Sequence, residues 1–488
     1  MSDPFKNSNQ QTKKEEESDL VNEFKEILIK HSDTPEEFAE AGGYATVSAT
    51  VGRFFNSRYE FKGRPNTWIC LSSIPGRRRR STVLEAVDFV INKVNETLFY
   101  TEAEKRFSIQ LKEAEKVKKD KKMKTVEQIL EKIVDDCIIE DGSAEGIADQ
   151  IQGSKLDVYH ISNEEFGCTL QEAYGKDSYK SGVKVLLSKL YDGNSVKVSL
   201  SQRGGKAGIR RIRKGLYVTL FCGMQEIHLY ITEFAIRQGV QRRIFMVYVQ
   251  VNHRYKDLIG KARAQYWWDL TNYAMKVASF AQKCKELAEE NKKFNSDISF
   301  IDVQWDVGVD TEINKVDEEV NRAVDVLKPT LRDMAKLSHG VHLAKFCMIR
   351  EIAKMNIVNF DTEEKPLHTV IIKKDSFEKA MDFMNRVGKS ADKSYDTIEE
   401  EASTKKYQTT DTSVARDRIL NFIGEHMPEG VSQSQITLKF KNSMTADEIT
   451  KLTTDLIQFG EITSDSLSTG GRKVTRWKIK EPKKEEET

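Results

Sequence analysis

The sequence lacks long hydrophobic runs and carries almost no excess charge of either sign. Its longest apolar stretches, such as residues 216–224, fall well short of the roughly 18 residues that a membrane-spanning helix needs. The 77 Lys and Arg residues are balanced by 76 Asp and Glu residues, which leaves a formal net charge of +1 among 488 residues. No global basic field therefore attracts nucleic acid or a membrane surface. Residues 1–18 also lack the apolar core of a signal peptide, so we expect a cytoplasmic protein without a membrane partner.

Cysteine and histidine are scarce and scattered. The six cysteines form no close pairs of the kind that zinc or dithiol chemistry requires, and the eight histidines include no HExxH or other closely spaced set. We expect six buried, reduced thiols, and we interpret His160 and His228, on predicted strands, as core residues. Zinc-dependent hydrolysis, disulfide-stabilised folds and a Ser–His–Asp site have no support in the sequence.

Changes in composition along the chain predict several segments. Helical spacing of apolar residues marks helices, short apolar runs mark strands, and charged stretches with few apolar residues mark tails and linkers. The predicted segments are a disordered tail (1–18), a helical preface (19–55), a core (56–255) with a charged helical insertion (102–136), a helical appendage (256–387), a linker (388–411), a small C-terminal domain (412–480) and a charged tail (481–488).

The predicted core alternates strands with helices. Alternation of this kind is typical of a mainly parallel sheet that helices cover on both faces, so we predict an α/β fold of three layers. The predicted strands are 67–73, 137–140, 157–162, 216–223 and 244–251, and the predicted helices are 81–94, 143–151 and 183–191.

The loop after the first core strand carries four consecutive arginines. It reads Ser-Ile-Pro-Gly-Arg-Arg-Arg-Arg-Ser-Thr over residues 73–82 and resembles a degenerate P-loop, in which Arg80 stands where lysine is expected. The guanidinium groups and the start of the following helix favour an anion, and the Ser81 hydroxyl is a candidate Mg²⁺ ligand. The ligand can be ATP or another phosphate such as a nucleic-acid backbone, and a merely exposed basic loop remains an alternative. The candidate phosphate-binding residues are Gly76, Arg79, Arg80, Ser81 and Thr82.

The order of several short segments resembles a known family. Around the arginine loop, the chain carries DGSAEG at 141–146, HISNEEF at 160–166, LYDG at 190–193, GMQ at 223–225 and GVQRRIF at 239–245. Together they resemble a domain-of-unknown-function family of RecA-like, replicative-helicase-related ATPases of plasmids, viruses and integrated elements. The similarity covers roughly residues 55–390.

This resemblance implies a role for several residues. Glu164 would polarise the attacking water, with Asn163 in place of the metal-associated aspartate, and Gln225 would sense the γ-phosphate. Arg243 would reach the nucleotide of a neighbouring subunit. The resemblance further implies ATP and Mg²⁺ as cofactors, a homo-oligomer such as the hexamers common among relatives, and action on DNA in replication of a mobile element or virus, with a replication partner protein. Because the P-loop lysine and this aspartate are both replaced, a non-catalytic DNA-binding or assembly protein is a second hypothesis.

The C-terminal segment 412–480 has the pattern of a winged helix. Ser432 with Gln435, and Thr445 with Glu448, fit capping boxes that start helices, and a terminal hairpin follows. The third helix is mostly acidic, so cations on the predicted wing favour binding of phosphates with little sequence choice. A transcription regulator, or a winged helix used for protein contacts, is the alternative. The candidate DNA-binding residues are Lys451, Arg472, Lys473, Arg476, Lys478 and Lys480.

Overall fold

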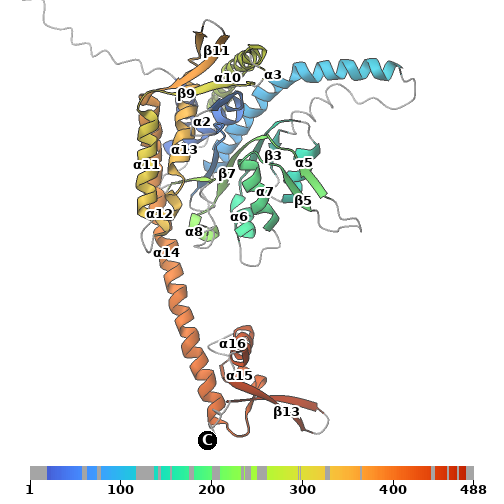
Figure 1. Ribbon diagram of the computed structural model, residues 1–488, viewed down its shortest axis with the longest axis vertical. Coiled ribbons are helices and arrows are strands. Elements are labelled where there is room, and N and C mark those ends of the chain that lie inside the picture. The colour runs from blue at the N-terminus through green and yellow to red at the C-terminus, as the bar shows by residue number, and fades with distance from the viewer. Residues whose placement is uncertain are drawn as a thin grey trace, which may run out of the picture. The chain divides into compact units, whose positions relative to one another are not determined.

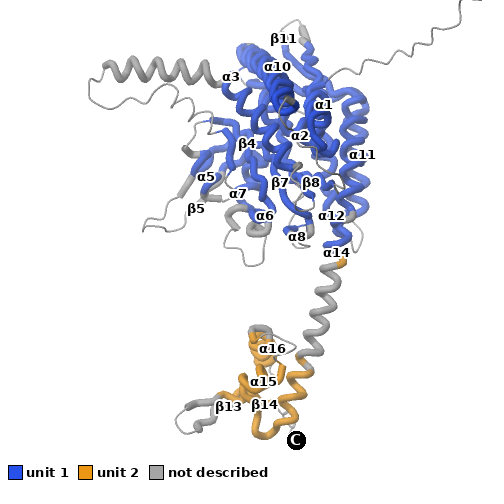
Figure 2. The backbone as a smooth tube through the Cα atoms, turned by 180° about the vertical axis from the view of Figure 1, so that it is seen from behind, with its two compact units in different colours: residues 1–399 blue, residues 400–488 orange. Residues whose placement is uncertain are grey.

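The computed structural model divides the chain into two compact units, residues 1–399 and residues 400–488, termed unit 1 and unit 2 (Figure 2). The predicted tails at 1–18 and 481–488 lie outside the described residues. The structure describes residues 19–57, 63–73, 79–116, 137–140, 144–153, 156–174, 181–199, 209–231, 236, 243–249, 261–294, 296, 298–324, 330–362, 365–440, 446–458, 461–469 and 472–479.

Unit 1 is built on a five-stranded parallel sheet (Figure 1). The two strands β2 and β7 are buried along their whole length, as expected for strands that are covered on both faces. The strands, in their order across the sheet, are β3 (Ile138–Ile139), β4 (Val158–Asn163), β7 (Tyr217–Met224), β2 (Trp68–Ser72) and β8 (Phe245–Tyr248).

Helices cover both faces of this sheet. Ile69 and Leu71 of β2 belong to one hydrophobic core, and Trp68 and Cys70 belong to the other, because successive side chains of a strand point to opposite faces. The first core includes residues of α2 (Glu36–Thr50), α3 (Arg79–Lys116) and α10 (Lys261–Phe294), and the second includes residues of α5 (Ala144–Gly153), α6 (Phe166–Tyr174) and α7 (Ser181–Tyr191). The predicted α/β class is therefore confirmed.

A second, mixed sheet pairs strands from segments that lie far apart in the sequence. Its order is β1 (Phe55–Ser57), β9 (Ile301–Trp305), β11 (Lys365–Ile372) and β10 (Val358–Thr362), and β10 alone is antiparallel to its neighbour. No strand of this sheet was among the predicted core strands. Unit 1 also contains the hairpin β5 (Val196–Ser199) and β6 (Ile209–Ile212) and the short helix α8 (Ile227–Tyr230).

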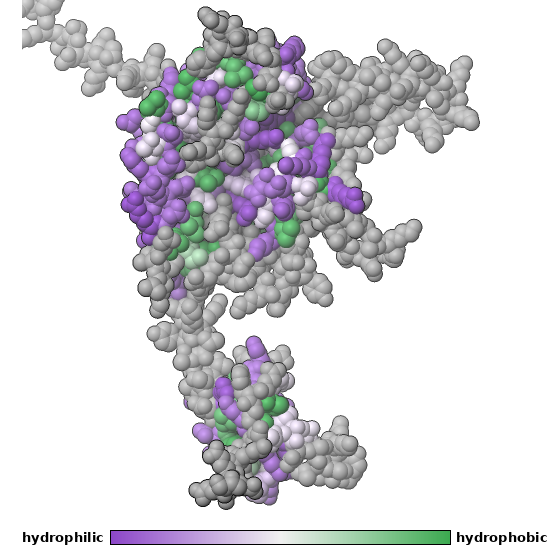
Figure 3. All heavy atoms as spheres, viewed as in Figure 1, coloured by the Kyte–Doolittle hydropathy of each residue, from purple (hydrophilic) through white to green (hydrophobic). Residues whose placement is uncertain are grey.

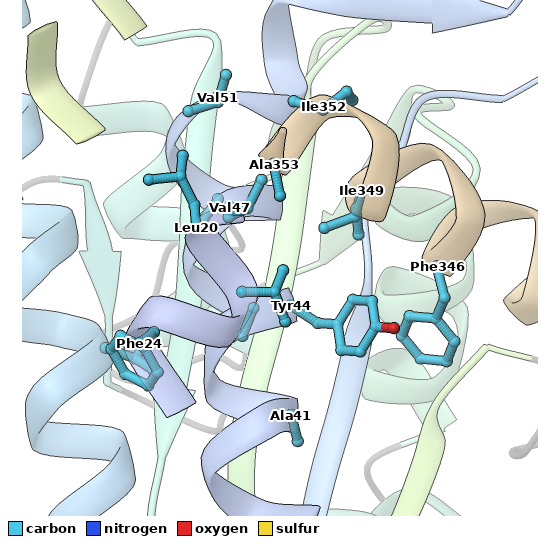
Figure 4. Close-up of a cluster of buried hydrophobic side chains, with 14 of the residues drawn as sticks. Leu20, Phe24, Ala41, Tyr44, Val47, Val51, Phe346, Ile349, Ile352 and Ala353 are labelled. Carbon is cyan, nitrogen blue, oxygen red and sulfur yellow. The ribbon is translucent and has the colours of Figure 1, made fainter. Parts of the chain in front are cut away.

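The predicted helical preface and helical appendage are parts of unit 1 and not separate segments. Helices α1 (Leu20–His31) and α13 (His339–Ala353) contribute to the same core as α2. Figure 4 shows Tyr44 of α2 beside Phe346 of α13, with ring centroids 4.7 Å apart. The boundaries predicted near residues 55 and 255 therefore need correction, because apolar faces of both segments are buried against one another.

The predicted linker at 388–411 also needs correction, since a single helix, α14 (Lys374–Glu425), spans it. Its apolar residues are few, but Ala391, Tyr395 and Ile398 have helical spacing and are buried in the second core of unit 1. That core also includes residues of α12 (Leu331–Lys336), which follows α11 (Val309–Val324). In the predicted charged insertion, residues 102–116 belong to α3, whereas 117–136 lie outside the described residues.

Unit 2 contains the helices and the hairpin that the sequence predicted. The end of α14 is followed by β12 (Val431–Ser432), α15 (Gln433–Phe440), α16 (Ala446–Gln458), β13 (Ile462–Thr469) and β14 (Arg472–Ile479). The antiparallel sheet has the order β12-β14-β13. The Gln435 amide N–H donates to Ser432 Oγ (3.3 Å) and Ser432 N–H donates to Gln435 Oε1 (2.8 Å), which caps α15. Thr445 of the second predicted box lies outside the described residues.

Hydrophilic residues predominate on the described surface of both units in the space-filling view, and hydrophobic residues form small groups (Figure 3). Within the described residues, no helix combines the length and hydrophobicity needed to cross a bilayer. None of the six cysteines forms a disulfide, and five of them are buried, whereas Cys168 on α6 is exposed. The prediction of six buried thiols is therefore wrong at one position.

Candidate functional site

The ends of three neighbouring strands bring the candidate residues to one edge of the central sheet. Because β2, β7 and β4 are parallel, their carboxyl ends meet at the same edge, which is where α/β sheets commonly bind ligands. Ser72 ends β2 and lies opposite Met224 of β7, and Asn163 ends β4 opposite Cys222. Ser72 Oγ donates a hydrogen bond of 2.6 Å to the backbone oxygen of Gln225, directly after β7.

Ser81 and Glu164 meet at this edge. Ser81 lies in the first turn of α3, and Glu164 directly follows β4. The Ser81 hydroxyl donates to Glu164 Oε2 over 3.0 Å. A Cβ atom at Gly223 would lie 3.0 Å from the backbone oxygen of Glu164, so glycine in β7 lets this segment approach closely. Residues that follow two strands which are not adjacent, β2 and β4, are thus placed within hydrogen-bonding distance.

Arg80 provides positive charge beside these groups. Its guanidinium is half-buried and close to Glu164, Glu165 and Tyr230, and burial lowers the pKa of Arg80. Arg80 Nη1 and the Ser73 hydroxyl are buried without a hydrogen-bond partner among the described residues. Both groups can donate to an anion, and unsatisfied buried donors are costly without one.

The rest of the arginine loop is described only in part. Gly76 lies outside the described residues, and so does the side chain of Arg79. Thr82 follows Ser81 on α3 and is half-buried. Among the described residues, no three His, Cys, Asp or Glu side chains come together as metal ligands. Ser81 and Glu164 nevertheless supply hard oxygen donors, the type that Mg²⁺ prefers.

Both polar atoms of the Asn163 side-chain amide form hydrogen bonds to the backbone. Its Nδ2 donates to the backbone oxygen of Glu140 over 2.9 Å, and its Oδ1 accepts from the Glu165 N–H over 2.8 Å. An aspartate could accept the second bond but could not donate the first. The amide therefore ties the end of β3 to the end of β4, which explains asparagine at this position.

A half-buried acidic group that the sequence analysis missed lies behind the site. Asp88 of α3 accepts from Ser162 Oγ over 2.7 Å, and its Oδ1 is 3.6 Å from His160 Nε2. Burial raises the pKa of Asp88 to about 7 and lowers the pKa of His160 to about 3. His160 is buried, with Nδ1 2.9 Å from Thr219 Oγ1. The signal for Asp88 was an acidic residue between Val87 and Val90, on the apolar face of a helix.

The structure does not bring Arg243 to this edge. It precedes β8 and therefore lies at the amino edge of the sheet, opposite the ends of β2 and β4. Its Nη2 is 3.7 Å from Asp192 Oδ2. Gln225, by contrast, lies between the ends of β2 and β4 and is half-buried. Within one chain, Arg243 and Glu164 thus belong to opposite edges.

The candidate DNA-binding residues belong to unit 2. Lys451 is exposed on α16, and Arg476 and Lys478 are half-buried on β14, where Arg476 Nη1 donates to the Glu429 oxygen over 3.2 Å. Trp477 and Ile479, between and after these cations, pack against the core of unit 2. The side chains of Arg472 and Lys473, and all of Lys480, lie outside the described residues.

Comparisons with protein families and with curated proteins identified no relative of this chain. No model of a protein family matches the chain, and no curated protein matches it either. The functional interpretation therefore depends on the residues at the carboxyl edge themselves.

Proposed function

We propose that unit 1 binds the polyphosphate of ATP at the carboxyl edge of its central sheet and is a RecA-like, helicase-related ATPase. The observation that carries this proposal is the 3.0 Å hydrogen bond between Ser81, at the start of α3, and Glu164, after β4. It joins the helix that follows the arginine loop to the carboxylate expected to act on water. Strand β7 lies between β4 and β2, and Gln225 directly follows it. This position supports a sensor role for the Gln225 amide.

Each group at the edge has a chemical task in this proposal. Arg80 and the first amides of α3 bind phosphate oxygens, since the start of a helix and a guanidinium both favour anions. Glu164 holds and polarises the attacking water as a general base. Mg²⁺, if bound by the Ser81 hydroxyl and the phosphates, would neutralise phosphate charge.

The same proposal assigns DNA binding to unit 2 and assembly to unit 1. The order of helices and hairpin in unit 2 supports a winged helix whose β14 cations, Arg476 and Lys478, contact phosphates. Arg243 lies at the edge opposite Glu164, so the role that the resemblance gives it, contact with the nucleotide of a neighbouring subunit, requires a homo-oligomer. The family resemblance supports replication of a mobile element or virus as the process.

Phosphate release from ATP, with and without DNA, tests the proposal. We expect Glu164→Gln to slow release by at least about 100-fold, the range for losing a general base. Glu165→Gln is the matched control, because Glu165 is the adjacent exposed carboxylate and makes no hydrogen bond to Ser81. Equal rates for the wild-type chain and Glu164→Gln would reject an ATPase.

The second candidate function is a DNA-binding assembly protein that binds nucleotide without turnover. It is favoured by Arg80 at the lysine position, because a planar guanidinium cannot replace a compact ammonium in a tight phosphate loop, and by the amide of Asn163, which is engaged by the backbone. This candidate predicts that a fluorescent ATP analogue binds the wild-type chain and does not bind the Arg80→Ala variant. Neither the wild-type chain nor the variant should release phosphate from ATP.

A further inference from the structure

A groove lies at the amino edge of the central sheet, on the side opposite the candidate ATP site. Two hollows with volumes of about 390 Å³ and about 680 Å³ share Asn56, Arg64 and Gly215 as lining residues. Arg64 precedes β2 and Gly215 precedes β7, which places the hollows at the edge where these strands begin. We name these two adjoining hollows the amino-edge groove.

Cations line the amino-edge groove along its length. Arg53 and Lys285 line the smaller hollow, Arg64 lines both, and Lys345 lines the larger one. The carboxylates among the described lining residues are those of Asp157 and Asp192. Each is ion-paired with an arginine that does not line either hollow, Asp157 with Arg213 (2.5 Å) and Asp192 with Arg243 (3.7 Å). The described lining residues of the groove therefore include four cations and two carboxylates, and an arginine offsets each carboxylate.

Lys345 adds a buried positive charge to the larger hollow. Its Nζ donates to the backbone oxygen and to Oδ1 of Asn66, over 2.8 and 2.9 Å, and lies 3.9 Å from the centre of the Tyr191 ring. No carboxylate accepts a hydrogen bond from this ammonium within the described residues, and burial lowers the pKa of Lys345 to about 7. The nearby carboxylate of Asp192, which is ion-paired with Arg243, raises this pKa in part, and a bound anion would further stabilise the charged form of Lys345.

The shape and the side chains of the groove select an extended ligand. Arg64 is exposed, and its Nη1 donates to the Gly215 oxygen over 2.9 Å, so a guanidinium is held where the two hollows meet. Phe54 and Phe300 are half-buried and line the smaller hollow, and Arg53 Cζ lies 4.7 Å from the centre of the Phe54 ring. Cations along a groove with aromatic rings beside them bind a single nucleic-acid strand through its phosphates and bases.

We propose that the amino-edge groove binds a single strand of nucleic acid. This proposal deepens the proposed function, because it assigns to unit 1 a strand-binding surface apart from unit 2. Only the identification of the bound strand as DNA rests on the proposed function. It does not depend on ATP hydrolysis. The strand lies at the edge opposite the carboxylate of Glu164.

Fluorescence anisotropy of the full chain with a labelled oligo-dT strand, over a range of salt concentrations, tests this proposal. We expect Arg64→Gln with Lys285→Gln to reduce the slope of log K against log salt by about 1.4, since each lost contact to a single strand contributes about 0.7. At 0.1 M salt this corresponds to about 25-fold weaker binding. Arg64→Gln alone, at an exposed position, is expected to reduce the slope by about half as much.

The matched control changes two exposed cations of α11, Lys315→Gln with Arg322→Gln, each ion-paired with a glutamate of the same helix. The control should keep the wild-type slope. An unchanged slope in the Arg64 and Lys285 variants, or an equal reduction in the control, would overturn the proposal. Strand binding is measured without nucleotide and phosphate release without DNA, so the failure of this proposal is distinguishable from the failure of the proposed ATPase.

Discussion

The buried His160 and the half-buried Asp88 form a pair whose pKa values move in opposite directions. The pKa of Asp88 is raised from 3.8 to about 7, and that of His160 is lowered from 6.5 to about 3, both by burial. Between about pH 4 and 6.5, the folded pair therefore holds its proton on Asp88, whereas the unfolded chain holds it on His160. The two contributions to the pH dependence of stability oppose each other in this range. The pair therefore causes little net change in the free energy of unfolding with pH.

Asp88→Asn should reveal one half of this compensation. A carboxyl with a raised folded pKa contributes stability that is fully present below about pH 4 and is lost as the pH rises to about 7. The free energy of unfolding of the variant relative to wild type should therefore increase between pH 4 and 7, by up to about 1.4 kcal/mol per pH unit. Urea unfolding at several pH values measures this difference.

His160→Gln is the complementary variant. Because the folded pKa of His160 is lowered, its contribution is present above pH 6.5 and is lost as the pH falls towards 3. Its difference from wild type should change with pH in the opposite direction to that of Asp88→Asn. Parallel stability curves for both variants and the wild type would show that neither group is held in the protonation state inferred from its burial.

At the scale of elements, one arginine ties three helices together. Arg350 of α13 is buried and donates from Nη1 to Asp19 Oδ1 (3.1 Å), at the cap of α1, and from Nε to the Tyr44 hydroxyl (2.8 Å). It also forms an ion pair with Glu40 of α2. Both carboxylates are almost inaccessible to solvent. The segments 19–50 and 339–353 thus share one charged network, which is why they belong to a single unit.

Arg350→Met should destabilise unit 1 by about 3–5 kcal/mol, because Asp19 and Glu40 would remain as buried charges without this partner. Arg322→Ala on α11, which removes an exposed ion pair with Glu318, should cost at most about 0.5 kcal/mol. Denaturant unfolding compares the two variants. If they lost equal stability, the buried network would not hold these helices together.

Several elements were predictable because their signals are local. The five core strands and the capped helix after Ser432 follow from short apolar runs and from a capping pattern. The predicted linker was wrong because three apolar residues, Ala391, Tyr395 and Ile398, suffice to bury one face of a long charged helix. The mixed sheet was missed because β1 and β9 are short strands that pair across more than 240 residues.

At the scale of the whole molecule, each unit has hydrophobic cores of its own. The core of unit 2 consists of residues from its three helices and its sheet, among them Ile423, Ile449 and Ile462. No residue of this core belongs to the two cores of unit 1. Independent cores predict that the two units unfold in separate transitions.

Ile449→Ala tests this independence. It should lower the stability of unit 2 by about 2–5 kcal/mol, since it removes a buried side chain and leaves a cavity. Differential scanning calorimetry of the full chain should show that only one transition moves. Leu343→Ala, at a fully buried position of α13 in unit 1, is the matched control and should move the other. A shift of both transitions in either variant would contradict separate units.

The amino-acid pattern sets the class of fold, the bounds of most core strands and the residues at their ends, because periodicity and caps are properties of neighbouring residues. It also identified Ser81 as a candidate, and the family resemblance implied a role for Glu164. Which strand lies beside which is decided in the folded chain, by pairing between segments far apart in sequence. That pairing places Ser81 3.0 Å from Glu164, puts Arg243 at the other edge, brings Asp88 beside His160 and creates the amino-edge groove.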